Sequence, residues 1–243
     1  MSKSFFIDTT LCTACRACQV ACKQWHDLPA EKTTNRGSFQ NPADLSFDTY
    51  KLVRFSEQVI DGKFNWLFFP EQCRHCIDAP CLETADDPSA IFRDTATGAV
   101  IFTANTKNLD VEAIIESCPY NIPRKAADGT LAKCDMCLDR VQNGELPACV
   151  KTCPTGAMNF GERDEMLDLA KKSLTRAKKK FPKAALLDAD YVNVIYLTAY
   201  DPDLYYEYAV GSVTKPKSNE MTRHIALQKM FKPFTAAAKV LAG

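Results

Sequence analysis

The stretch CTACRACQVAC, residues 12–22, carries four cysteines at the spacing C-x2-C-x2-C-x3-C. At this spacing three thiolates wrap around one iron–sulfur cubane, while the fourth lies on the following helix and ligates a neighbouring cluster. One such run therefore needs a second run to complete both clusters. The stretch predicts a fold organised around iron–sulfur clusters.

A second run, CDMCLDRVQNGELPACVKTCP at residues 134–154, completes the first. A loop separates its third cysteine from the second, so that spacing is longer than in the first run, but the terminal C-x3-C-P is intact. Pairing the two runs crosswise predicts two complete [4Fe-4S] sites. The first site comprises Cys12, Cys15, Cys18 and Cys153, and the second site comprises Cys134, Cys137, Cys149 and Cys22.

The middle of the chain supplies a third site by the same pairing, from Cys73, Cys76, Cys81 and Cys118. Cys118 precedes a proline, and counting back from it at the standard spacing gives the ligand positions of a fourth site. None of these positions is a cysteine: they are Asn108, Val111, Ile114 and Ala85. The four ligands of one cluster are lost together, and we expect the apolar side chains among their replacements to fill its volume.

Two alternative interpretations explain fewer of the twelve cysteines. If each motif filled its own cluster, Cys73, Cys76 and Cys81 would form a three-cysteine site, and Cys118 would belong to none. Tetrahedral zinc suits paired C-x2-C units such as CRHC and CDMC, but it explains neither the opening triplet nor the C-P endings. Crosswise pairing uses all twelve thiols as three sets of four, and we prefer it.

The composition of the 243-residue chain excludes several classes of function. Cysteines gathered in tight runs indicate metal or cluster ligation rather than a disulfide scaffold. Thirty basic and thirty acidic side chains give zero net charge, whereas binding to nucleic acid phosphates needs a basic surplus. The opening MSKSFFIDTT leads straight into the first motif, and no stretch reaches about eighteen uninterrupted apolar residues. We therefore expect neither a cleavable signal nor a membrane span.

The motifs repeat as cysteine loop, helix and strand, beginning near residues 12, 73, 108 and 134. The hydrophobic patterns predict strands at 4–10, 50–58, 64–69, 98–105, 155–161 and 191–200, helices at 108–118, 164–181 and 224–243, and an irregular loop at 29–49. The expected fold class is α+β, with two pseudo-symmetric ferredoxin-like modules. Residues 1–35 and 125–162 form an outer module with two clusters, residues 36–124 an inserted module with one, and residues 163–243 a C-terminal extension for subunit docking.

Several fully ligated clusters in one small chain indicate a path for electrons. A Lewis-acid cluster keeps one iron open and so has only three cysteines, and a structural role does not account for three clusters. Because the sequence contains no paired catalytic acids, phosphate loop or nucleotide fingerprint, we expect a non-catalytic electron-transfer chain. The basic run at residues 171–183 is either a docking surface or a solvated helix face.

Charged and histidine side chains near the ligands have two interpretations each. Arg16, Arg74 and Lys133 either raise cluster potentials, which depend on nearby charge, or are charges at the surface or facing a partner. His75 lies between two ligands and is not needed as one. We expect ordinary roles for His26 and His224, which have no companion ligand in the sequence.

The chain resembles the electron-transfer subunits of molybdenum and tungsten oxidoreductases over residues 5 to about 162. Within this range CTACRACQVACKQWHDLP, NPADLS and YKLVRF are similar to the β subunit of formate dehydrogenases. KCDMCLDRVQNGELPACVKTCPTGA is shared by the wider superfamily. Many members carry four clusters in two modules, and the loss of one site makes this chain most similar to the soluble three-cluster subunits of sulfate-reducing bacteria.

The resemblance implies a heterodimer with a large catalytic subunit that holds a tungsten or molybdenum bis-pterin cofactor. Electrons from formate would cross three [4Fe-4S] clusters to an external acceptor such as a multihaem cytochrome c. The outer module would lie nearest the catalytic subunit, and the third site would lie at the exit. Export together with the large subunit would place the pair in the periplasm; the alternative location is the cytoplasm. The alternative functions are an equivalent subunit of another pterin oxidoreductase or hydrogenase, and a free-standing polyferredoxin.

Overall fold

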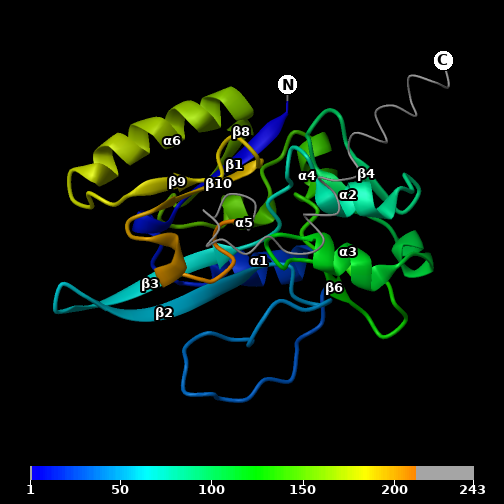
Figure 1. The fold of residues 1–243 in the computed structure, drawn as a ribbon, viewed down its shortest axis with the longest axis horizontal. Coiled ribbons are helices and arrows are strands. Elements are labelled where there is room, and N and C mark those ends of the chain that lie inside the picture. The colour runs from blue at the N-terminus through cyan, green and yellow to red at the C-terminus, as the bar shows by residue number, and fades with distance from the viewer. Residues whose placement is uncertain (1, 212–243) are drawn as a thin grey trace, which may run out of the picture. The chain divides into compact units, whose positions relative to one another are not determined.

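The computed structural model describes residues 2–211 (Figure 1). The helices are α1 (Ala17–Trp25), α2 (Pro80–Ala85), α3 (Val111–Ser117), α4 (Leu138–Gln142), α5 (Ala148–Lys151) and α6 (Arg163–Lys178). The strands are β1 (Lys3–Asp8), β2 (Leu52–Ile60), β3 (Lys63–Glu71), β4 (Ile91–Arg93), β5 (Val100–Phe102), β6 (Arg124–Lys125), β7 (Leu131–Ala132), β8 (Met158–Glu162), β9 (Ala185–Leu187) and β10 (Val194–Thr198). Helices and strands are both well represented, which confirms the α+β class.

The strands and helices predicted within the described residues are confirmed. The six predicted strands correspond to β1, β2, β3, β5, β8 and β10, and two of the predicted helices to α3 and α6. The predicted loop at 29–49 contains no helix or strand beyond one bridge between Ser46 and Thr49. The predicted helix at 224–243 lies outside the described residues.

A four-stranded sheet, in the order β8-β1-β10-β9, forms the centre of the fold. β1 pairs in parallel with β10 and antiparallel with β8. Successive side chains of a strand point to opposite faces, so Phe5 and Ile7 pack on one face and Phe6 on the other. α6 covers the Phe6 face, and the face of Phe5 and Ile7 packs against the cysteine loops. The sheet thus separates a surface helix from the candidate ligands.

The chain beyond residue 162 contributes to this central sheet. α6, β9 and β10 all come from the predicted C-terminal extension, and β10 pairs with β1 of the predicted outer module. The part of the extension that the structure describes therefore shares a sheet with that module. The module boundaries and the docking role stay predictions.

The β2–β3 hairpin projects beside the central sheet (Figure 1). Asp61 and Gly62 form its turn, and both have left-handed backbone angles, with φ of 49° and 72°. Two positive φ values characterise the type I′ turn that matches the twist of a two-residue hairpin. The hairpin brings its base, where Leu52 and Phe69 are fully buried, against the cysteine loops.

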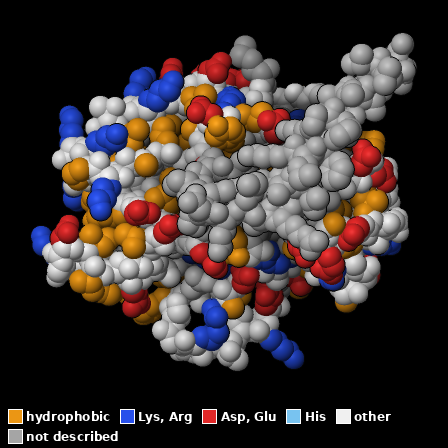
Figure 2. Space-filling view, viewed as in Figure 1, with side chains coloured by type: hydrophobic (Ala, Val, Ile, Leu, Met, Phe, Trp, Pro, Cys, Tyr) orange, Lys and Arg blue, Asp and Glu red, His pale blue; other side chains and the backbone are white. Residues whose placement is uncertain are grey.

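The predicted basic run falls on α6 and the turn that follows it. Ala170, Ser173 and Ala177 of α6 are buried against the sheet, while the lysines of the run are exposed. Figure 2 shows basic side chains gathered over α6. The run therefore forms a solvated helix face; its role in docking stays a prediction. Within residues 2–211 no helix combines the length and apolar character needed to cross a membrane.

Candidate iron–sulfur cluster sites

The three C-x2-C loops share one backbone turn. In each loop the residue before the second cysteine has a left-handed conformation: φ is 53° at Ala14, 46° at His75 and 68° at Met136. Such a conformation costs on the order of 1–3 kcal/mol for a residue other than glycine and is found mainly at functional sites. The same turn in three separate loops indicates that it serves the cysteines on either side of it.

This turn directs a peptide N–H group at the first sulfur of each loop. The N–H of His75 donates to Cys73 Sγ at 3.4 Å, and the N–H of Met136 donates to Cys134 Sγ at 3.5 Å. In the first loop the N–H of Ala14 interacts in the same way with Cys12. Hydrogen bonds to ligand sulfur are among the influences that set cluster potentials.

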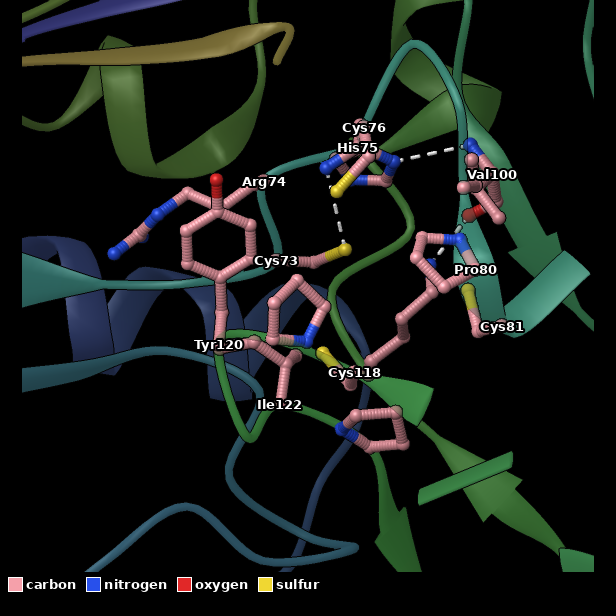
Figure 3. A pocket seen from close by; sticks show the side chains of 14 residues that line it. Cys73, Arg74, His75, Cys76, Pro80, Cys81, Val100, Cys118, Tyr120 and Ile122 are labelled. Atoms are coloured by element: carbon pink, nitrogen blue, oxygen red, sulfur yellow. Dashed lines mark hydrogen bonds between the residues drawn. The ribbon is translucent and has the colours of Figure 1, made fainter. Parts of the chain in front are cut away.

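The predicted third site is a single cavity between β3, α2 and α3. Figure 3 shows the four cysteine side chains around one space. The cavity wall otherwise consists largely of apolar groups, including Pro80, Val100 and Ile122. The cysteines that line it are Cys73, Cys76, Cys81 and Cys118.

The predicted first site is a similar cavity at the start of α1. Its loop follows β1, and its last cysteine follows α5, which packs against α1. Val53 and Met158 are among the apolar side chains in its wall. The cysteines that line it are Cys12, Cys15, Cys18 and Cys153.

The predicted second site lies where α1, α4 and α5 meet. Cys22 is on α1, Cys149 is on α5, and Cys137 is the residue that caps the start of α4. Cys22 interacts electrostatically with Cys149 and Cys137, and Cys134 interacts with Cys22 and Cys149. The structure therefore brings together each of the three predicted sets of four cysteines.

The surroundings of these thiols suit an iron–sulfur cluster. Burial raises the pKa of Cys12, Cys118 and Cys149 to about 11 in each case, so the metal-free thiols are neutral at pH 7. The thiolate is the form that ligates metal, and iron replaces the proton as the positive partner of each sulfur. Four converging thiols in apolar walls fit a cluster with four cysteine ligands.

Neighbouring sites are linked by pairs of nearby thiols. Cys149 of the second site interacts electrostatically with Cys18 of the first site. On its other side, Cys134 of the second site interacts with Cys73 of the third site. The second site therefore lies between the other two.

Three of the four positions predicted for the lost fourth site pack among apolar side chains. Ala85 on α2 and Val111 and Ile114 on α3 belong to one hydrophobic cluster. Ile114 is only 1% exposed, whereas Asn108 is at the surface. Side chains from the two facing helices occupy this part of the fold, as the apolar replacements predicted.

Two of the three basic residues beside ligands are buried, so the surface interpretation is wrong for them. Arg74 is 2% exposed, and its guanidinium lies 4.2 Å from the ring centre of Tyr196 and 5.0 Å from those of Phe69 and Tyr120. Lys133 is 6% exposed and donates to the carbonyl oxygens of Val100 and Cys134. The sequence could not reveal this, because both residues are of types that usually face water.

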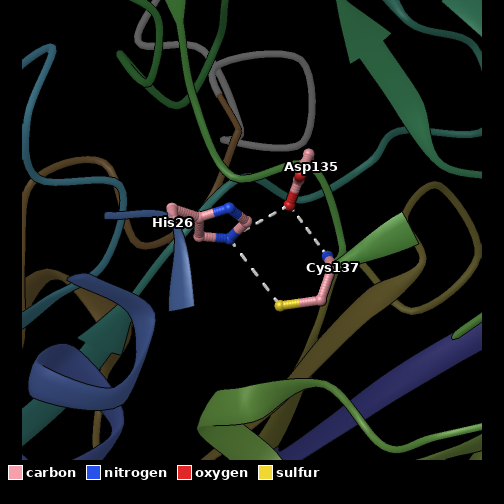
Figure 4. Close-up of side chains that lie close together, drawn as sticks. All are labelled: His26, Asp135 and Cys137. Carbon is pink, nitrogen blue, oxygen red and sulfur yellow. Dashed lines mark hydrogen bonds and ion pairs between the residues drawn. The ribbon is translucent and has the colours of Figure 1, made fainter. Parts of the chain in front are cut away.

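His26 has companions that the sequence pattern does not show, so the expectation that it lies alone is wrong, while its role stays a prediction. Its Nε2 atom lies 3.8 Å from Cys137 Sγ and 3.4 Å from Asp135 Oδ1 (Figure 4). These three side chains could hold a metal ion, but Cys137 is a predicted ligand of the second site, and by that prediction the histidine is a neighbour of that site. His224 lies outside the described residues.

Lys51 is a functional candidate that the sequence motifs did not single out. It precedes β2 and is 2% exposed. Burial alone would lower its pKa, yet the thiols of Cys18 and Cys149 raise the pKa of Lys51 above its usual value. The sequence feature that could have indicated Lys51 is its place as the single lysine at the start of the otherwise apolar segment KLV.

The comparisons with known proteins agree with this chemistry. Residues 64–163 match the family of 4Fe-4S dicluster domains. The formate dehydrogenase subunit beta of Megalodesulfovibrio gigas is 60% identical over 215 residues, which span 87% of this chain and 100% of the relative. The formate dehydrogenase 2 subunit beta (cytochrome c-553) of Nitratidesulfovibrio vulgaris is 55% identical over 216 residues, spanning 86% and 99%. The nitrate-inducible formate dehydrogenase iron-sulfur subunit of Escherichia coli is 38% identical over 239 residues, spanning 95% and 78%.

Proposed function

The chain belongs to the family of formate dehydrogenase β subunits, and from this premise we propose that it conducts electrons through three [4Fe-4S] clusters. It is an electron-transfer subunit of formate dehydrogenase, and its partner is the catalytic subunit that supplies the electrons. The observation that carries the proposal is the gathering of twelve cysteines into three sets of four. When bound, each cluster supplies one-electron oxidation and reduction.

The residues of this chain hold the clusters and set their surroundings. Three sets of thiolates ligate iron, and the peptide N–H groups of His75 and Met136 donate to ligand sulfur. Apolar walls such as Val100 and Ile122 exclude water from the third site. Low exposure and the number of hydrogen bonds to sulfur both tune a cluster's potential.

The proposed electron path runs from the first site through the second to the third. The nearby thiol pairs Cys18–Cys149 and Cys134–Cys73 support this order. By analogy with the family, the first site faces the catalytic subunit and the third site faces the external acceptor. In this scheme the fourth cluster of the ancestral plan was replaced by the apolar contacts of Ala85, Val111 and Ile114.

We further propose that the two cysteine-rich halves are ferredoxin-like modules with the bounds given above. The left-handed turn common to Ala14, His75 and Met136 supports a repeated unit. The catalytic subunit is proposed to carry a tungsten or molybdenum bis-pterin cofactor. The printed name of the Nitratidesulfovibrio vulgaris relative includes cytochrome c-553, which supports a cytochrome c as acceptor and a periplasmic location for this chain.

The proposal is tested by counting the clusters in the purified complex. Iron quantification and low-temperature EPR should yield about twelve irons for this chain and no three-iron signal. About eight irons, or a three-iron cluster, would contradict the three complete sites. Metal analysis of the co-purified large subunit and its activity with formate distinguish this function from that of another pterin enzyme, a hydrogenase or a free-standing polyferredoxin.

A further inference from the structure

A buried lysine lies between the first and second sites. The ammonium group of Lys51 donates to Gln72 Oε1 and, at 3.4 Å, to the carbonyl oxygen of Pro70. Only 2% of the residue is exposed to solvent. These two neutral acceptors fix the ammonium group in place, but they do not neutralise its charge.

Pro70, whose carbonyl oxygen accepts from Lys51, lines the cavity of the first site. Lys51 interacts electrostatically with Cys18 of the first site, with Cys149 and Cys134 of the second site, and with the phenol group of Tyr196. Cys12 and Cys22 experience the same positive charge. Among the described residues, no carboxylate forms an ion pair with Lys51.

An isolated buried charge is strongly destabilising unless a charge of opposite sign compensates it. A cubane ligated by four thiolates carries net negative charge, and reduction by one electron makes that charge more negative by one unit. A fixed cation beside the cluster therefore stabilises the reduced form more than the oxidised form, because the Coulomb energy grows with the cluster's charge and is large in a poorly solvated interior. This difference raises the reduction potential.

We propose that Lys51 is the shared counter-ion of the first and second sites and raises the reduction potentials of both clusters. The inference rests on the proposed assignment of the three cluster sites. It gives Lys51 a positioning and tuning role in electron transfer, although the residue lies 22 positions from the nearest cysteine in the sequence, Cys73. A residue at the base of the β2–β3 hairpin would thereby influence the reduction potentials of both clusters of the outer module.

Lys133 provides a matched comparison at the other end of the path. It is also buried, and its positive charge acts on Cys81 and Cys118 of the third site. Its ammonium lies 4.7 Å from the ring centre of Phe102 and donates to the carbonyl oxygens of Val100 and Cys134. The two lysines thus act on different sets of clusters.

The test is a redox titration of the whole heterodimer, followed by EPR. Lys51→Met removes the charge and keeps a side chain of similar length, so two of the three midpoint potentials should fall. Lys133→Met should lower the midpoint potential of the third-site cluster, which Lys51→Met should leave unchanged. Lys51→Arg should restore potentials close to those of the unchanged protein. Lys151→Met, which removes an exposed charge two residues from Cys149, should change none of them, because solvent screens that charge.

Each outcome decides the inference. Loss of iron from two sites in Lys51→Met that Lys51→Arg restores also supports the counter-ion. Unchanged potentials, an equal fall at all three clusters, or the same loss of iron in the Met and Arg variants would overturn it. Iron content and EPR of the unchanged protein test the three-site proposal separately, so a normal wild-type result with an inert Lys51→Met defeats only this inference.

Discussion

The Nε2 atom of His26 lies 3.8 Å from the Sγ atom of Cys137, at the end of α1. The same nitrogen is 3.4 Å from a carboxylate oxygen of Asp135. When Cys137 is a thiolate ligand, both neighbours are hydrogen-bond acceptors, and the tautomer with its proton on Nε2 donates toward the sulfur. The imidazole ring is held in this position against Tyr50, with ring centres 5.5 Å apart.

Replacing His26 with phenylalanine should lower the reduction potential of the second-site cluster alone. The ring contact with Tyr50 is kept, while the donor to Cys137 is removed, and a hydrogen bond to ligand sulfur favours the reduced cluster. EPR-monitored redox titration measures the shift. Trp25→Phe is the control, because Trp25 is the neighbouring exposed aromatic and its indole N–H donates to Asp139 rather than to a sulfur. A shift confined to another site would contradict the assignment.

Arg54 connects three separate segments of the fold, and its loss should be severe. Its Nε donates to Glu71 at 2.5 Å, while its Nη2 pairs with Asp44 and donates to Tyr206 at 3.0 Å. Glu71 is fully buried, so Arg54→Met leaves its carboxyl group without the guanidinium that donates to it, with only the electrostatic attraction of Arg74, and should cost about 3–5 kcal/mol. The thermal unfolding midpoint of the complex, at a fixed scan rate, measures the loss. Arg36→Met, at an exposed position, should change stability by less than about 0.5 kcal/mol; similar midpoints for the two variants would contradict the buried pair.

Local patterns in the sequence predicted six of the ten strands that the structure describes. They also predicted which cysteines come together, while the role of these cysteines as ligands stays a prediction. The apolar run Phe5, Phe6 and Ile7 predicts a strand, and the structure places these residues in two separate cores, one on each face of the sheet. Cysteine spacing predicts which thiols meet, because a short loop fixes the direction of each side chain. The strand signal and each C-x2-C spacing lie within a few residues, whereas the pairing of motifs as distant as Cys12 and Cys153 came from the repeat of the motif along the chain.

Features that depend on distant segments could not be predicted in this way. The pairing of β1 with β10 joins residues about 190 positions apart, and no local pattern specifies that partner. The contact of His26 with Cys137 arises only when α1 packs beside the loop before α4. The burial of Lys51 and Lys133 likewise follows from tertiary packing, which overrides the usual preference of lysine for the surface.

The apolar contacts at the lost fourth site should contribute substantially to stability. Ile114 is 1% exposed and packs in the cluster that includes Ala85 and Val111, so Ile114→Ala should destabilise the protein by about 2–5 kcal/mol through lost burial and a residual cavity. Asn108→Ala is the matched control at the exposed position of the same site and should change stability by less than about 0.5 kcal/mol. Thermal unfolding of the two complexes compares them. Equal midpoints would show that the site is not a packed core.

Cys118→Ser tests the position of the third site in the electron path. Serine replaces the thiolate with a poor iron ligand, so the variant should lose about four of twelve irons while the heterodimer still assembles. If the third site is the exit, formate oxidation with an artificial dye that accepts electrons from the catalytic subunit should be retained, and transfer to a cytochrome c should fall steeply. Ser117→Ala is the control, because Ser117 is the neighbouring residue and its hydroxyl donates only to the carbonyl oxygen of Ile114. Equal loss of assembly and of electron delivery in Cys118→Ser would show that the third site supports the complex rather than ending the path.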